Sequence, residues 1–248
     1  MNELDLSRQF RVYDNMLILF TQNIKAKSHC HHGIEIIIGL KDSFSIEHGN
    51  RMIKSKGAII RQDIRHSISS GDGTTTYIFI EPEDNLGQAL NRVLNGKDVL
   101  TLDKKVTARI SEHLKKHLHT DHFEADMKQC LQDIFIPFAR HDGESYLDER
   151  IKKVIKHINA SLESPIDFTD LKTISCLSES RLIHLFKSEV GIPIRKYVLW
   201  CRLREALRHV ENGNYISKAA IRSGFADAAH FSRTFVSMFG INPSQMLR

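Results

Sequence analysis

The chain has 248 residues, of which 41% are hydrophobic and 26% are charged, and its formal net charge is +5. This length and balance are those of an ordinary globular protein of one or two domains, and no apolar run approaches the about 20 residues of a membrane span, so we expect no membrane contact. Four cysteines without CxxC spacing, behind an N-terminus that lacks a secretory signal, predict free thiols and a cytoplasmic location.

The first third of the chain is predicted to form strands, within about residues 10–82. Short apolar runs are separated by turn-forming segments and recur about every ten residues, which favours a small antiparallel barrel or sandwich. The sequence His48-Gly49-Asn50 predicts a tight hairpin turn. The runs are MLILF (16–20), IEIIIGL (34–40), GAIIR (57–61) and TYIFI (76–80).

Helical spacing of apolar residues replaces this pattern between about 83 and 140, where we expect two or three helices. Such helices would cover the open face of the sandwich or present an apolar stripe to a second chain. The polar segment HDGESY (141–146) reads as a linker. We therefore expect two domains, 1–141 and 142–248.

The second domain is predicted to be helical throughout. Helix-turn-helix units are expected at about 168–190 and 216–239, joined by one long helix, Ile194–Asn212. In the second unit, Gly224 suits a helix C-cap and Asp227 an N-cap. Residues 146–248 hold 16 Lys and Arg against 10 Asp and Glu, whereas the remainder is nearly neutral. A basic module suits a polyanion, although a solvated charged surface has the same composition.

The wording of this region resembles the AraC/XylS family of transcription regulators. The resemblance covers about 100 residues and implies an α+β protein. Its N-terminal part would be a cupin-like β-barrel or sandwich followed by helices, and its C-terminal part an all-α module whose two recognition helices enter successive major grooves about 34 Å apart. The matching residues are Leu182, Phe186-Lys187, Gly191, Pro193, Tyr197, Arg202-Leu203, Ala206, Ile216, Ala219-Ala220, Gly224-Phe225, Asp227, Phe231, Arg233, Phe235, Phe239-Gly240, Asn242-Pro243 and Arg248.

The resemblance also assigns DNA-facing positions. In the first unit, Arg181 and Lys187 would hold phosphates, and His184 could donate to a guanine edge. Cys176 stands where the family commonly has a turn Gly. Because Ala228 and Ala229 offer few hydrogen bonds, we expect the first unit to carry most of the direct readout. The full set is Ser180, Arg181, Ile183, His184, Lys187, Ala228, Ala229, Ser232 and Arg233.

A histidine cluster marks the first domain. His29, His31 and Glu35, with His66 on a later strand, resemble the metal set of the cupin fold, and imidazoles with a carboxylate suit a divalent metal such as Zn. An HxH pair on a strand would place both rings on one face of the sheet. Three interpretations stay open: a metal site, a pocket for a small organic effector, or a structural vestige that needs no cofactor.

We expect a DNA-binding regulator, more an activator than a repressor, controlled by an effector or by homodimerisation through the first domain. Its partners would be double-stranded DNA and RNA polymerase. The alternatives are a metal-dependent cupin enzyme fused to a DNA-targeting module and an architectural DNA binder. We expect no enzyme activity, because no nucleophile triad, phosphate loop or GxGxxG pattern is present.

Overall fold

The computed structural model describes residues 10–71, 73–118, 120, 122–138 and 147–247. The predicted linker at 141–146 lies outside the described residues. By its internal contacts the chain divides into two units. The first comprises 1–142 together with 236–248, and the second comprises 143–235.

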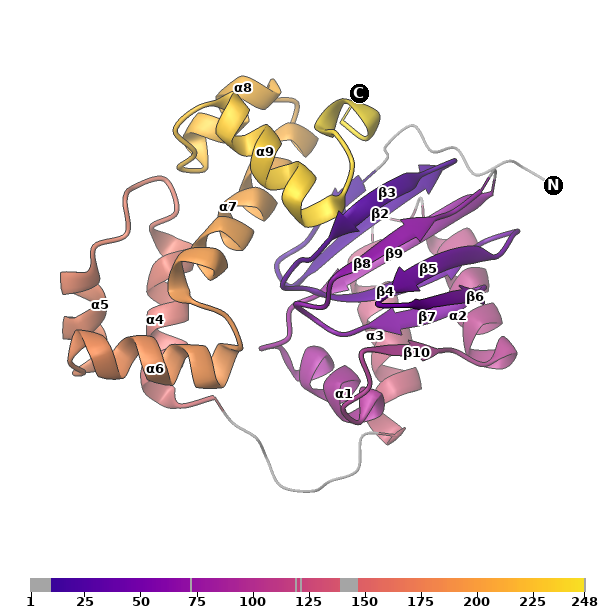
Figure 1. The fold of residues 1–248 in the computed structure, drawn as a ribbon, viewed down its shortest axis with the longest axis horizontal. Coiled ribbons are helices and arrows are strands. Elements are labelled where there is room, and N and C mark those ends of the chain that lie inside the picture. Colours follow the sequence, from indigo (N-terminus) through magenta and orange to yellow (C-terminus); the bar gives the residue numbers. More distant parts are fainter. Residues whose placement is uncertain (1–9, 72, 119, 121, 139–146, 248) are drawn as a thin grey trace. The chain divides into compact units, whose positions relative to one another are not determined.

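The first unit contains two antiparallel sheets (Figure 1). The larger sheet has the strand order β1-β2-β9-β4-β7-β10, and the smaller has the order β3-β8-β5-β6. The four apolar runs form β2, β4, β7 and β9 as predicted, and Gly49-Asn50 makes the two-residue hairpin between β5 and β6. The strands are β1 (Phe10–Val12), β2 (Met16–Gln22), β3 (Lys25–His29), β4 (Ile34–Gly39), β5 (Phe44–His48), β6 (Arg51–Ser55), β7 (Gly57–Ile60), β8 (His66–Ser69), β9 (Thr74–Ile80) and β10 (Val99–Thr101).

The larger sheet is buried on both faces, which explains why its central strands are nearly continuous apolar runs. Alternate residues such as Ile18, Ile36 and Ile78 pack against helices in one core. The intervening residues, among them Glu35 and Tyr77, point to the side where the smaller sheet lies and line a pocket there. A carboxylate therefore stands in the interior because of its place in the alternation.

Three helices cover the outer face of the larger sheet: α1 (Asn85–Leu94), α2 (Lys104–His117) and α3 (Phe123–Phe135). Asp84 and Asp103 accept hydrogen bonds from the first turns of α1 and α2. Of the two roles predicted for these helices, covering the sheet is the one that their buried faces perform. Strand β10, between α1 and α2, was not predicted and pairs with the β7 edge.

The second unit holds the predicted helices. They are α4 (Glu149–Ala160), α5 (Phe168–Ser175), α6 (Glu179–Val190), α7 (Ile194–Glu211), α8 (Ile216–Arg222) and the first part of α9 (Ala228–Phe239). Gly224 has φ +80° and ends α8, and Asp227 Oδ1 accepts from the His230 N–H, 2.6 Å away, at the start of α9. Among the described residues, no helix has both the length and the apolar character needed to span a bilayer.

Candidate functional sites

Helix α6 presents one polar face to solvent. Its apolar side is fixed by Leu182, Phe186 and Val190, which are buried, and the Phe186 ring meets Tyr197 of α7 edge-on, with centroids 5.5 Å apart. The five predicted DNA-facing residues of this helix, Ser180, Arg181, Ile183, His184 and Lys187, are all exposed. Ile183 keeps 38% of its surface accessible although it is a large apolar side chain, so it is available to a thymine methyl.

Helix α9 has a smaller polar face. Phe231 and Phe235 anchor it, while Ala229 and Arg233 are exposed and Ala228 is half-buried. Ser232 Oγ donates to the carbonyl oxygen of Ala228, 2.8 Å away, so this hydroxyl has an intrahelical partner. In the described part of the chain, no carboxylate lies within ion-pair distance of Arg233, which leaves its guanidinium available to phosphate or base.

The other site is the histidine cluster of the first unit. His29 ends β3 directly opposite His66 of β8, whereas His31 lies in the connection to β4. The HxH pair is thus not on one strand as predicted, because β3 ends between its two members. Ring nitrogens of the three histidines nevertheless lie within 4.8 Å of one another, and all three residues are buried.

Each histidine of the cluster is oriented by a backbone carbonyl. Nδ1 of His29 lies 2.7 Å from the Lys27 oxygen, that of His31 2.9 Å from the Gly33 oxygen, and that of His66 2.8 Å from the Ile64 oxygen. A carbonyl only accepts, so all three Nδ1 atoms carry a proton. In the neutral rings Nε2 then carries a lone pair, which is the arrangement found in metal-ligating histidines.

Glu35 adds a carboxylate to these rings. Its Oε2 lies 3.5 Å from His31 Nε2 and 3.1 Å from His66 Nε2. Burial favours the neutral acid, but the two imidazoles outweigh it and lower the pKa of Glu35, which stays ionised. Burial and the neighbouring imidazoles of His66 and His31 lower the pKa of His29 to about 3. A lone pair that faces a carboxylate oxygen is repulsive, so the site favours a cation between these atoms.

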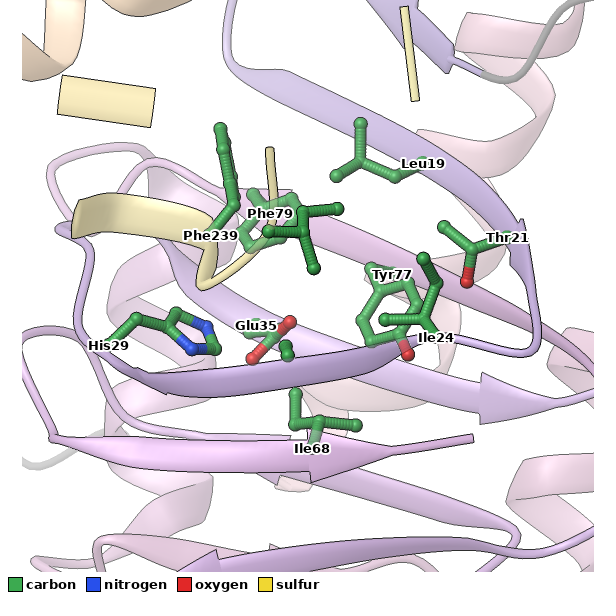
Figure 2. A pocket seen from close by; sticks show the side chains of 11 residues that line it. Leu19, Thr21, Ile24, His29, Glu35, Ile68, Tyr77, Phe79 and Phe239 are labelled. Atoms are coloured by element: carbon green, nitrogen blue, oxygen red, sulfur yellow. The ribbon is translucent and has the colours of Figure 1, made fainter. Parts of the chain in front are cut away.

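A pocket extends from the cluster between the two sheets (Figure 2). His29 and Glu35 lie at one end and Tyr77 toward the other, while Phe239 and Ile241 of the C-terminal segment complete the wall. The free volume is about 20 Å³, which is room for a single water or ion. The remaining lining is mostly apolar: Leu19, Thr21, Ile24, Ala26, Ile68 and Phe79.

Sequence reasoning missed the partners of His32. Its Nε2 lies 2.6 Å from Glu83 Oε1 and its Nδ1 3.1 Å from Asp63 Oδ2. Burial alone would lower its pKa, but these carboxylates raise it to about 10. His32 is therefore an imidazolium that ties together three connections of the barrel. No local signal links residues this far apart in sequence.

Comparisons with known proteins agree with this architecture. Residues 171–248 match the helix-turn-helix domain family HTH_18. The probable transcriptional regulator LumQ of Photobacterium leiognathi is 26% identical over 231 residues, which cover 89% of this chain and 92% of that protein. The arabinose operon regulatory protein of Escherichia coli K12 is 30% identical over 101 residues, 40% of this chain and 35% of that protein.

Solved structures match over nearly the whole chain. Apo ToxT of Vibrio cholerae superposes with a TM-score of 0.67 at 15% identity, covering 96% of this chain and 99% of that chain. The fold is thus a β-rich domain followed by helix-turn-helix elements, a DNA-binding class. Within that class the protein is an AraC-type transcription regulator, as the C-terminal wording indicated.

Proposed function

We propose that this protein binds specific DNA sequences through α6 and α9 and activates transcription in response to a ligand of its first unit. Support comes from α6, which leaves every predicted base- or phosphate-facing residue exposed while its opposite side is buried. Of these residues, Arg181 and Lys187 suit phosphates, and Ser180, Ile183 and His184 suit base edges. Arg233 is the strongest candidate on α9, beside Ala228, Ala229 and Ser232.

Partner surfaces are part of the proposal. Tyr215 and Ile221 at α8 expose 84% and 55% of their surfaces, and such apolar side chains in a basic module suit a contact with RNA polymerase. We place homodimer contacts on the outer faces of α2 and α3, where Arg109 and Asp133 form a half-exposed ion pair at 3.7 Å. Effector binding would then shift the population that can occupy paired DNA sites. A cytoplasmic location follows from this role.

A divalent metal such as Zn at His29, His31, His66 and Glu35 is the ligand that the cluster supports best. Two ligands of one zinc ion lie at most about 4.2 Å apart, so a small inward turn of the rings would close the site. A substrate, by contrast, would not fit the cavity of about 20 Å³, which weighs against the alternative of a metal-dependent enzyme. ToxT, whose fold this chain shares, has been solved with an unsaturated fatty acid bound. An organic effector is therefore the competing interpretation.

A genome-wide map of the full-length protein tests the proposal directly. It should recover one recurrent sequence upstream of a limited set of genes. Affinity for that sequence should fall with salt, with a slope set by the number of phosphate contacts. Uniform coverage of the genome would contradict sequence-specific regulation.

A further inference from the structure

The C-terminal segment Phe239-Gly240-Ile241 is seated in the mouth of the pocket. Figure 2 shows Phe239 over the cavity, near Phe79 and opposite the side from which Glu35 points in. The Phe239 ring lies 5.4 Å from that of Phe79 and 6.4 Å from that of His31, centroid to centroid. Both Phe239 and Ile241 are buried, at 4% and 6% exposure.

Backbone contacts hold this segment on β3. The Lys27 N–H donates to the Gly240 carbonyl oxygen at 2.9 Å, beside the irregularity that interrupts pairing of β3 with β8. Gly240 has φ +69°, and a β-carbon there would lie 2.3 Å from the Lys27 oxygen and 2.7 Å from His29 Nδ1. Only glycine meets both demands, the left-handed backbone and the close approach.

We infer that residues 239–241, here called the lid segment, act as an internal competitor for the pocket of the first unit. The inference rests on the proposed sensory function and specifies its ligand and its regulation. Phe239 and Ile241 fill apolar space between Leu19, Ile24 and Phe79 and leave room for an ion or water. An organic effector must therefore displace these two side chains. It has an apolar body about the size of the side chains that it replaces, and a polar end at His29 and Glu35.

The lid segment also has a direct covalent link to the DNA-reading surface. It continues α9, whose residues Ser232 and Arg233 lie two turns before Phe239 on the same helix. Release of the lid segment frees the end of α9 from β3. Ligand occupancy thereby reaches the reading helix without any further element.

A matched pair of glycine variants tests the lid segment. Gly240→Ala introduces both backbone strain and the clash with β3. Gly49→Ala introduces similar strain, because φ is +57° there, but its β-carbon would meet nothing within 4 Å. The probe is the apolar dye 1-anilinonaphthalene-8-sulfonate, added to the full-length protein. We expect Gly240→Ala to bind about one dye per chain at least tenfold more tightly than wild type and Gly49→Ala do. Equal dye affinity in all three folded proteins would overturn the inference.

Hydrogen exchange of wild-type protein gives a second measurement that needs no variant. The Lys27 N–H is protected by the Gly240 carbonyl in the closed state. Saturating dye should speed its exchange at least tenfold, while the Ile36 N–H in β4 stays protected. Unchanged Lys27 exchange under saturating dye would contradict competition. Neither readout involves DNA, so failure of the lid inference and failure of DNA recognition are distinguishable.

Discussion

Arg202 and Gly224 occupy adjoining space in the second unit: a β-carbon on Gly224 would lie 2.6 Å from Arg202 Nε and 2.1 Å from the Leu162 carbonyl oxygen. The guanidinium donates to the carbonyl oxygens of Leu162, at 3.1 Å, and Ser164, at 2.8 Å. Helix α7 is thus joined both to the segment after α4 and to the turn of the second helix-turn-helix unit. Two residues of the family wording have a shared physical reason in this contact.

Gly224→Ala should destabilise the second unit by about 3 kcal/mol, because left-handed strain of about 1–2 kcal/mol adds to overpacking against a fixed carbonyl. Gly213→Ala is the control, since its φ is +85° but nothing lies within 4 Å of its β-carbon. We expect it to cost about 1 kcal/mol. Urea unfolding followed by the fluorescence of Trp200, which is buried in α7, reports on this unit. Equal losses in the two variants would exclude the clash.

Cys176 ends α5 with φ 53° and ψ 35°, in the left-handed region where glycine is favoured. Its side chain is exposed, so little packing would be lost on truncation. Cys176→Gly should therefore stabilise the second unit by about 0.5–1 kcal/mol, and Cys176→Val, with a branched β-carbon, should destabilise it. The same Trp200 titration measures both. A loss of stability on Cys176→Gly would show that this cap is not strained.

His184→Ala should relax sequence preference more than Ser232→Ala. The His184 ring is exposed on α6, whereas the Ser232 hydroxyl already donates within α9. Loss of one good base contact costs about 1–3 kcal/mol of discrimination, and that loss should be confined to one position of the DNA site. Competition binding with single-base variants of the recovered sequence measures the effect. Equal relaxation by both substitutions would place the readout elsewhere.

His66→Gln should abolish zinc binding, because it removes one of three clustered imidazoles and leaves Glu35 with fewer partners. Elemental analysis of the purified wild-type protein should give about one zinc per chain. His48→Gln is the control: this histidine pairs with Asp98 at 3.1 Å, away from the cluster. Wild-type protein that takes up no zinc, even when zinc is supplied, would leave the pocket to an organic effector.

Much of the second unit follows from the sequence because its signals are local. Capping residues such as Asp227 and turn residues such as Gly191 and Gly224 lie next to the helix ends that they define. Strands of the smaller sheet were harder to predict. β3 and β6 expose most of their side chains, so Lys25–His29 and Arg51–Ser55 contain no apolar run.

The histidine cluster was only partly predictable. His29, His31 and Glu35 lie close in sequence, but the placement of His66 depends on the pairing of β3 with β8. Contacts of Phe239 and Gly240 with the barrel join residues about 200 positions apart, and their wording already had an explanation in the family signature. A long-range contact leaves no trace in local periodicity.

The central claim is that α6 and α9 read a specified DNA segment. It is tested most directly by titrating full-length protein, at moderate salt, against the recovered sequence and a shuffled duplex of the same composition. We expect the recovered sequence to bind at least 100-fold more tightly, with that preference reduced by His184→Ala. Equal affinity for the two duplexes would contradict the account.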